Sequence, residues 1–418
     1  MIYLDHNATT RPAPDVVAAM RRALEEWWPN PSSIHRPGQT ARQQIDLARK
    51  HLAELIGTRP RFLTFTGSGT ESLDLAIRGH LLARGLIGAA NANTHGGPPT
   101  IITTPIEHIG VRELARALER EEGVHVLMAD LDEQGVVQAT SVERLLNEHP
   151  QTALVSVQWA NNETGAIQPV EIIGKICRER NVTFHCDATQ WVGKMPVNVE
   201  GVVEMAEGDQ AGRHQSIEAV RGNLACDLLT FSPHKFHGPK GVGVLYARAG
   251  VRTAPLIHGE QELGRRGGTE NVPGIIGAGV AAQLALQWLR DEENPRRVGV
   301  LRDRFERAVL EAVPEARVNS AIGPRLYNTS SIGFPKLEAE ALLMLLSERG
   351  VCCSAGAACS SGSLEASAVI QAMKIAPDYA HGTLRFSLSR ETTVTEVDEG
   401  ARIVAECVAR LRRSWTGA

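Results

Sequence analysis

The chain has 418 residues, of which 43% are hydrophobic and 22% charged, and its formal net charge is −4 at pH 7. That length can bury a large core, and a slightly acidic chain with dispersed basic residues lacks the charge pattern of a nucleic-acid-binding protein. No apolar run approaches the roughly 20 residues of a membrane-spanning helix, and the first residues lead into a polar motif instead of a signal peptide. We therefore expect a cytoplasmic globular protein.

The order of the predicted elements indicates an α/β protein. Apolar residues recur at helical spacing over residues 15–27 and 40–56, which predicts two helices. Strand-like runs then alternate with helical stretches, an order typical of a mostly parallel sheet with helices on both faces. The predicted strands are 61–65, 100–104, 124–128, 153–159, 182–186, 227–231 and 242–246. From about residue 281 the chain is strongly helical, and it ends in a predicted helix over residues 394–413.

The predicted strand at 61–65 is followed by a turn rich in glycine and hydroxyl groups, with Gly69 and Thr70 just before a helical run. Main-chain N–H groups and the positive dipole end at such a helix start attract an anion. Alone, such a turn is more often only a helix cap. The residues that follow the later strands strengthen the prediction of an anion site at this turn.

Lys235 lies after a strand-like run, beside a histidine and before several glycines that allow tight turns and close approach of a ligand. An arbitrary lysine in a turn is usually a surface residue. However, Asp187 ends the preceding strand-like run. An enzyme that uses pyridoxal phosphate (PLP) needs a lysine to form a Schiff base and a carboxylate to keep the pyridine nitrogen protonated. Lys235 and Asp187 together predict a PLP site.

Cys359 lies among Ser, Gly and Ala residues in a stretch typical of an exposed loop. A zinc site is disfavoured, because Cys352, Cys353 and Cys359 have no matching second pair of ligands. We therefore predict that Cys359 is a nucleophile, which requires a reducing compartment. The other cysteines that we expect to be small buried side chains are Cys352, Cys353, Cys177, Cys186 and Cys226.

With Lys235, Asp187, Cys359 and several further motifs, the sequence resembles the cysteine desulfurases. These belong to the aminotransferase class V group of fold type I PLP-dependent enzymes. The resemblance runs almost from end to end, and its additional motifs lie at residues 3–10, 30–35, 161–165 and 384–390. It implies a large domain over residues 15–280 with a mostly parallel seven-stranded sheet flanked by helices. A smaller α+β domain, residues 1–14 and 281–418, would carry the cysteine loop.

The resemblance also implies roles around the cofactor ring. Lys235 would form the Schiff base, Asp187 would pair with the pyridinium nitrogen, and Gln190 would bind the phenolate oxygen. His108 would stack on the ring and shuttle protons, and Asn162 would lie near the ring and the substrate carboxylate. Without the resemblance, His108 and Asn162 equally fit structural roles.

The remaining implied roles concern the phosphate, the substrate and the sulfur. Arg385 would bind the substrate carboxylate through two parallel hydrogen bonds, a geometry suited to a guanidinium, and Cys359 would accept sulfur. Thr269 would reach across from a second subunit, so the enzyme would be a homodimer. No metal is expected. The residues expected to hold the phosphate are Gly69, Thr70, Ser232, His234 and Thr269.

The implied activity converts L-cysteine to L-alanine through a PLP aldimine, with a persulfide left on Cys359 for delivery to an acceptor such as an iron–sulfur scaffold or a thiol carrier. A selenocysteine lyase would use the same site, so the choice between sulfur and selenium stays open. A class V aminotransferase would have no need of Cys359. A sulfur carrier without catalytic activity is disfavoured, because Lys235 and Asp187 are both present.

Two features depart from the usual family pattern. Residues 200–223 form an insertion of roughly twenty residues, long for a connection without secondary structure, and we expect a tolerated surface excursion. Residues 85–100 are rich in Gly, Ala, Asn and Pro, which predicts a surface loop. The adjacent Cys352 and Cys353 raise the alternative of persulfide transfer to Cys353, which we disfavour because buried cysteines are usually inert.

Overall fold

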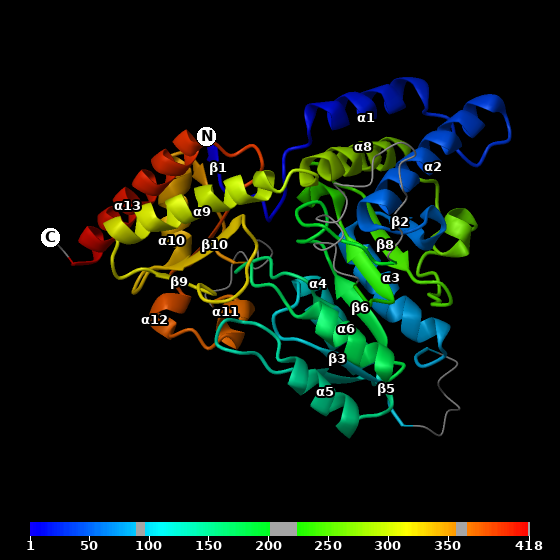
Figure 1. The fold of residues 1–418 in the computed structure, drawn as a ribbon, viewed down its shortest axis with the longest axis horizontal. Helices are drawn as coiled ribbons and strands as arrows, with labels where there is room; N and C mark the ends of the chain where they lie inside the picture. The colour runs from blue at the N-terminus through cyan, green and yellow to red at the C-terminus, as the bar shows by residue number, and fades with distance from the viewer. Residues whose placement is uncertain (89–96, 201–223, 357–365, 417–418) are drawn as a thin grey trace, which may run out of the picture.

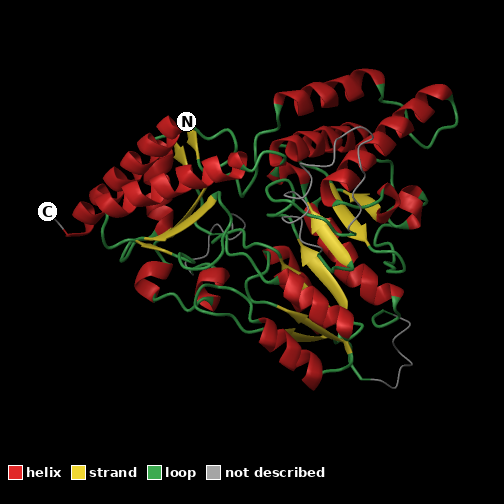
Figure 2. Ribbon diagram, in the orientation of Figure 1, coloured by secondary structure: helices red, strands yellow, loops and turns green. Residues whose placement is uncertain are grey.

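The computed structural model describes residues 1–88, 97–200, 224–356 and 366–416. Figures 1 and 2 show a large group of elements around a central sheet and a smaller group that holds both chain termini. The helices are α1 (Pro14–Glu26), α2 (Arg36–Ile56), α3 (Gly69–Ala83), α4 (Ile109–Glu122), α5 (Ala139–Glu148), α6 (Val170–Glu179), α8 (Val272–Leu289), α9 (Glu293–Ala312), α10 (Ala339–Glu348), α11 (Ala368–Ala372), α12 (Pro377–Ala380) and α13 (Val394–Thr416).

The central sheet has seven strands in the order β2-β8-β7-β6-β5-β3-β4, and only β8 runs antiparallel to its neighbours. The predicted α/β fold with a mostly parallel seven-stranded sheet is therefore confirmed. The first predicted strand begins later than expected, because Pro60–Phe62 forms a short 3-10 helix. The strands are β2 (Leu63–Thr66), β3 (Thr100–Thr103), β4 (His125–Met128), β5 (Thr152–Gln158), β6 (Thr183–Asp187), β7 (Leu228–Phe231) and β8 (Gly243–Ala247).

Alternate residues of the strands face two different apolar cores, because side chains on a strand point alternately to opposite faces. Leu228 of β7 and Leu245 of β8 pack into a core with the buried side chains of α3 and α4. Their neighbours Leu229 and Tyr246 pack into the larger core with α2, α5, α6 and α8. Both faces of the sheet are thus covered by helices, which explains why its strands are apolar throughout.

The parallel strands end at one edge of the sheet, and their register aligns polar residues there. Gln158 at the end of β5 is paired with Asp187 at the end of β6, which is paired with Thr230 of β7. β2 also ends at this edge and leads into α3. Ligands of open α/β sheets bind outside the carboxyl ends of the strands, so this edge is where a site is expected.

The smaller group of elements has its own apolar core, formed by Leu4 and by side chains between residues 298 and 411. Its strands form a three-stranded sheet, β12-β10-β9, and a two-stranded parallel pair, β1-β11. Helix α8 continues across residue 280, and the predicted division at residues 15–280 stays a prediction. The strands are β1 (Ile2–Tyr3), β9 (Arg317–Val318), β10 (Thr329–Gly333), β11 (Val351–Cys352) and β12 (Thr383–Ser387).

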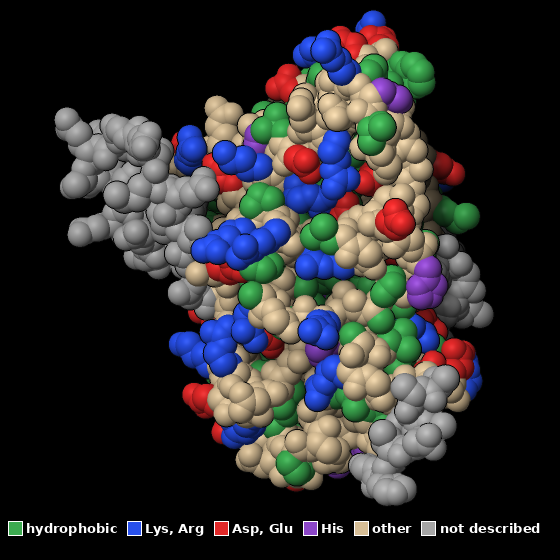
Figure 3. Space-filling view, turned by 90° about the vertical axis from the view of Figure 1, so that its right-hand side faces the viewer, with side chains coloured by type: hydrophobic (Ala, Val, Ile, Leu, Met, Phe, Trp, Pro, Cys, Tyr) green, Lys and Arg blue, Asp and Glu red, His purple; other side chains and the backbone are tan. Residues whose placement is uncertain are grey.

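Within the described residues, α8 is the one helix long and apolar enough to cross a membrane, but 56% of it is buried inside the protein. It packs against α1 and α2, as Figure 1 shows. This is the behaviour of a core helix. Figure 3 shows Lys and Arg side chains distributed over one face of the molecule among acidic and apolar side chains.

A buried ion pair joins α2 to residues that follow β8. Both guanidinium NH groups of Arg49 donate to the carboxylate of Glu262, at 2.7 Å each, and the carboxylate also accepts the main-chain N–H of Phe65 in β2 at 2.8 Å. Only 2% of the Glu262 side chain is exposed. The pair therefore ties α2 and β2 to the segment that carries Thr269.

We predict that Glu262→Ala lowers the free energy of unfolding by about 3–5 kcal/mol, because it leaves a buried guanidinium without its partner. Urea denaturation of the purified variant measures the change. The matched control is Glu25→Ala, which removes the partner of Arg21 in an exposed pair on α1 and should have little effect. Equal effects of the two substitutions would contradict this account.

Candidate active site

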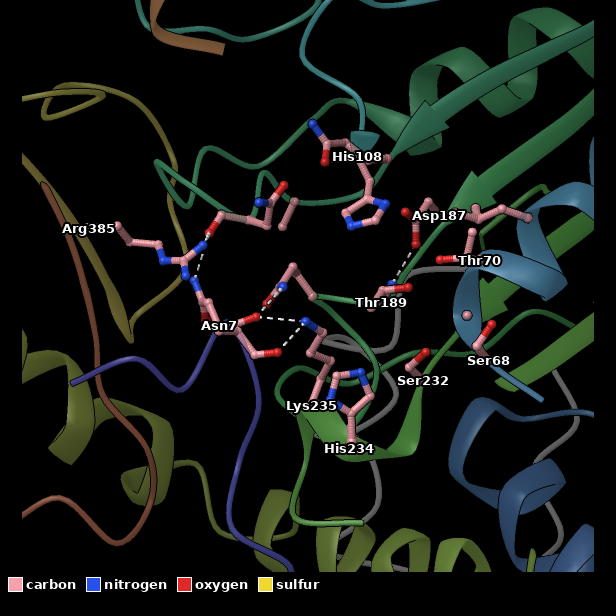
Figure 4. A pocket seen from close by; sticks show the side chains of 17 residues that line it. Asn7, Ser68, Thr70, His108, Asp187, Thr189, Ser232, His234, Lys235 and Arg385 are labelled. Carbon is pink, nitrogen blue, oxygen red and sulfur yellow. Dashed lines mark hydrogen bonds between the residues drawn. The ribbon is translucent and has the colours of Figure 1, made fainter. Parts of the chain in front are cut away.

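A cavity of about 200 Å³ opens at the carboxyl edge of the sheet, between the sheet and the smaller group of elements. Figure 4 shows Arg385 reaching into it from one side, Asp187 and Thr70 from the other, and Lys235 from below. The cavity brings together most of the predicted site residues. Its lining is Asn7, Ala8, Ser68, Gly69, Thr70, Leu73, His108, Gln158, Ala160, Asn162, Asp187, Thr189, Gln190, Ser232, His234, Lys235 and Arg385.

One end of the cavity is the amino terminus of α3. Ser68 caps this helix by accepting the N–H of Glu71 at 3.1 Å, while Gly69 and Thr70 lie in the first turn, whose N–H groups have no partner inside a helix. A Cβ atom on Gly69 would come within 2.3 Å of the Ser232 hydroxyl oxygen, so a larger residue would push this hydroxyl out of its place. The result is a compact group of N–H and hydroxyl donors that suits an anion.

His234 lies beside this group, in the 3-10 helix Pro233–Lys235 that follows β7. Its Nδ1 atom is 3.0 Å from the Thr9 hydroxyl. Burial, and then the charge of Lys235, lower the pKa of His234 to about 3. The ring is therefore neutral near pH 7 and acts through hydrogen bonds instead of through charge.

Asp187 and His108 face the middle of the cavity (Figure 4). Asp187 is 5% exposed, and its carboxylate accepts the N–H of Thr189 at 3.0 Å. His108 caps α4, where its Nδ1 accepts the N–H of Gly110 at 3.0 Å. Nδ1 is thereby assigned as the unprotonated nitrogen, and burial lowers the pKa of this histidine. His108 thus presents a neutral ring to the cavity.

Lys235 extends from the same 3-10 helix as His234 towards the amino-terminal strip of the chain. Its ammonium group donates to the main-chain oxygens of Asn7 and Ala8, at 2.8 Å each. The amine therefore lies at the cavity wall, where these two main-chain oxygens help to hold it.

Arg385, in β12, contributes a guanidinium group from the smaller group of elements. It donates to the carboxylate of Asp5 at 2.6 Å and to the main-chain oxygen of Asn162 at 3.0 Å. Its side chain is 3% exposed, and its buried Nε has no hydrogen-bond partner among the described residues. Buried polar groups normally have partners, so this donor is suited to an acceptor on a ligand.

Asn7 was not predicted as a site residue, although it lies within the motif at residues 3–10. It is 1% exposed, its side chain donates to Asn162 and Thr329, and its main-chain oxygen accepts from Gln190 and Lys235. Asn7 thus joins both groups of elements at the cavity. The motif indicated the family, but no periodicity or spacing singled out this amide.

Other lining residues were also not predicted, among them Ser68, Thr189 and Gln158. Ser68 and Thr189 adjoin predicted residues, so the sequence already contained a signal for them. Gln158 donates to the main-chain oxygen of Ile106 at 2.5 Å, which is a contact between distant segments. Such a contact leaves no trace in the local sequence.

Two predicted site residues are not in the cavity of the described chain. Thr269 is exposed and does not line it. Cys359 lies outside the described residues, and so does most of the insertion at 200–223, so both remain predictions. Of the cysteines expected to be buried, Cys177, Cys186 and Cys226 are buried, but Cys352 and Cys353 are only half-buried, because they lie on and just after the edge strand β11.

Behind His108 lies a fully buried carboxyl group, that of Glu107. Its Oε1 accepts from the Thr104 hydroxyl at 2.7 Å and from the N–H of Gln158 at 3.1 Å, while its Oε2 has no partner among the described residues. Burial raises the pKa of Glu107 to about 8. This carboxyl group is therefore largely protonated at neutral pH.

The fold, with a lysine, a carboxylate and a helix amino terminus at the carboxyl edge of its sheet, is that of the fold type I class. Residues 2–203 and 200–399 match the family model described as Aminotransferase class-V. The chain is 41% identical to a cysteine desulfurase of Nostoc sp. over 99% of its own length and 94% of that protein, and 40% identical to the cysteine desulfurase NifS of Azotobacter vinelandii over 100% and 95%. The chain belongs to this family, among its cysteine desulfurases.

Solved structures agree with this assignment. A NifS-like protein superposes with a TM-score of 0.83 at 34% identity and covers 98% of this chain and 100% of that one. A structure titled SspA in complex with cysteine superposes with a TM-score of 0.75 at 30% identity and covers 94% of this chain and 100% of that one. The likeness thus extends over nearly the whole fold.

The raised pKa of Glu107 predicts a pH-dependent stability difference between the wild type and Glu107→Gln. Between the ordinary value of 4.5 and about 8 the folded protein retains a proton that the unfolded chain releases, so this group's contribution to stability falls as pH rises. The amide of the variant cannot ionise. We therefore expect the free energy of unfolding of Glu107→Gln, relative to the wild type, to rise steadily from pH 5 to pH 8.

Urea unfolding at several pH values measures this difference. Glu25→Gln on the exposed face of α1 is the control and should show no such trend. A difference between Glu107→Gln and the wild type that stays constant with pH would show that Glu107 is ionised in the folded protein.

Proposed function

We propose that the protein is a PLP-dependent cysteine desulfurase that converts L-cysteine to L-alanine and transfers the sulfur to Cys359 as a persulfide. The observation that carries the proposal is the convergence of Lys235, Asp187 and Arg385 on one cavity. These three side chains come from distant parts of the chain. Together they provide an amine, a carboxylate and a carboxylate-binding guanidinium within reach of one small ligand.

The donors and acceptors of the cavity fit PLP. Gly69, Thr70, Ser232 and His234 would hold the phosphate at the amino terminus of α3. Asp187 would pair with the pyridine nitrogen, Gln190 would bind the phenolate oxygen, and His108 would lie against the ring. When bound, PLP supplies an electron-withdrawing ring that stabilises negative charge on the substrate.

The charge balance around the cavity supports an amino-acid substrate. Arg385 would bind the substrate carboxylate through its guanidinium group, with Asp5 fixing one side of that group. Asn162 adjoins Arg385 through its main-chain oxygen and lies at the substrate end of the cavity. Lys235 would remove the proton from the substrate Cα and return it elsewhere on the ligand.

In the sulfur step the Cys359 thiolate would attack the substrate sulfur. A sulfur–sulfur bond forms, the carbon–sulfur bond breaks, and its electron pair remains on the carbon, which is protonated to give alanine. The Cys359 persulfide would then carry the sulfur to its acceptor, which suits a residue in a stretch of small side chains.

The described residues on both sides of Cys359 lie next to the cavity. Ser354, on one side, pairs with Arg385 through two main-chain hydrogen bonds of 2.7 and 3.1 Å. Ser367, on the other side, donates to the carboxylate of Glu163 at 2.5 Å. Glu163 directly follows Asn162 of the cavity wall. Both attachment points of the cysteine segment therefore support access of Cys359 to the site.

We further propose a cytoplasmic homodimer in which Thr269 helps to bind the phosphate of the partner subunit. Thr269 is exposed, and Arg266 beside it is held by an ion pair of 2.8 Å to Glu71 in the first turn of α3. The segment is thus held at the surface near the phosphate end of its own cavity. The acceptor of the sulfur would be an iron–sulfur scaffold or another thiol carrier.

The proposed function is tested by incubating the purified protein with PLP, L-cysteine and a thiol reductant while alanine and sulfide are measured together. We expect equal amounts of both products and the loss of both in Cys359→Ala. Alanine formation that survives Cys359→Ala would favour an aminotransferase. Turnover of selenocysteine but not of cysteine would identify a selenocysteine lyase.

Replacement of Arg385 by lysine should separate substrate binding from cofactor binding. Arg385→Lys keeps the charge but loses the planar pair of donors, so we expect KM for L-cysteine to rise between about 10- and 100-fold, since a hydrogen bond to a charged group contributes about 1.5–3 kcal/mol. Bound PLP, measured by absorbance, should be retained. The control is Arg402→Lys in an exposed ion pair of α13, which should leave KM unchanged. An unchanged KM in Arg385→Lys would remove Arg385 from the proposed substrate site.

A further inference from the structure

Lys194 is a buried lysine directly behind the wall of the cavity. It is 5% exposed and does not line the cavity itself. Its amine donates to the side-chain oxygen of Gln190 at 2.7 Å and to the side-chain oxygen of Asn7 at 2.9 Å. Both of these amides do line the cavity. Lys194 therefore contacts the site only through two other residues.

No carboxylate forms an ion pair with Lys194 among the described residues. Burial lowers the pKa of Lys194 well below its usual value, and the positive charges of Lys235 and Arg385 lower it further. Burying an amine without a counter-ion is costly. The cost is offset in part by its two hydrogen bonds to amides of the cavity wall, which place its role at the site.

The hydrogen bonds around Gln190 show what Lys194 does there. The Gln190 oxygen faces the Lys194 amine, and its Nε2 donates one hydrogen to the main-chain oxygen of Asn7 at 3.1 Å. If the Gln190 amide were rotated by half a turn, its oxygen would face the main-chain oxygen of Asn7 and its nitrogen would face the amine of Lys194. The observed orientation leaves the second N–H of Gln190 without a partner among the described residues, on a side chain that lines the cavity.

Asn7 is held in the same way. Its side-chain oxygen accepts from Lys194 and from Asn328, and its main-chain oxygen accepts from Lys235. Two amines are thus bound to one residue, on different oxygens. The placement of Lys235 consequently depends on the same asparagine that Lys194 helps to fix.

We infer that Lys194 is a positioning residue with two effects. It orients the Gln190 amide so that an N–H group points towards the cofactor, and it fixes Asn7, whose main-chain oxygen accepts a hydrogen bond from Lys235. The inference rests on the proposed function, because Gln190 has an acceptor to bind only if PLP occupies the cavity. Lys194 itself touches neither the cofactor nor the substrate.

A double-mutant cycle on PLP binding tests this role. Apo-protein is titrated with PLP, and the dissociation constant and the absorbance spectrum of the bound cofactor are recorded for wild type, Lys194→Met, Gln190→Ala and the double variant. We expect each single substitution to weaken binding on the order of 10-fold and to shift the absorbance maximum. The effects of the two single substitutions should combine to less than their product in the double variant, because Lys194 acts in part through Gln190 and otherwise through Asn7.

Lys175→Met on the exposed face of α6 is the matched control and should bind PLP as the wild type does. Thermal unfolding of each apo-protein shows whether it is folded, and if Lys194→Met does not fold, Lys194→Gln takes its place in the cycle. Effects that multiply in the double variant, or a single variant with wild-type affinity and spectrum, would overturn the inference alone. A wild type that binds no PLP would overturn the proposed function together with it.

Discussion

The cavity depends on one buried asparagine in a strip of chain that crosses between the two groups of elements. The oxygens of Asn7 accept hydrogen bonds from Lys235, Lys194 and Gln190 on the sheet side. Its N–H groups donate to Ser387 and Thr329 of the smaller group. An amide suits this position because it both donates and accepts. The relative placement of the amine and of Arg385 therefore rests on hydrogen bonds that would be costly to break in a buried site.

The electrostatics of the described residues suit an anionic ligand. Lys235 and Arg385 lie near Asn7, and the carboxylates that line the cavity or bind Arg385 are those of Asp187 and Asp5, while burial lowers the pKa of Lys194 well below its usual value. The histidines add no charge, since burial lowers the pKa of His108 and His234. A cofactor phosphate and a substrate carboxylate would add negative charge beside the basic groups of Lys235 and Arg385.

Part of the candidate site could be predicted from the residues alone, because these residues follow strand ends. Asp187 and Lys235 come after apolar runs, and parallel strands bring such positions to one edge whatever the helices between them contain. Ser232, Gln190 and Arg385 were expected only from the resemblance to the family. Gly69 and Thr70 could be predicted from the chemistry of helix starts. Gln158 could not, because its contact with Ile106 joins segments far apart in the chain. Lys194 could not either, because its contact with Asn7 is equally remote and its contact with Gln190, four residues away, lies in no predicted helix.

By itself, the sequence determined the alternation of strands and helices, the family, and which residue types stand at the ends of the strands, since these depend on local periodicity and local motifs. Only the tertiary structure decided which of these residues meet. It joined Arg385 to Asn162 and Lys235 to Asn7, and it left Thr269 outside the cavity of its own chain. The physical reason is that burial and hydrogen bonding between distant segments set these contacts and the pKa shifts that follow from them.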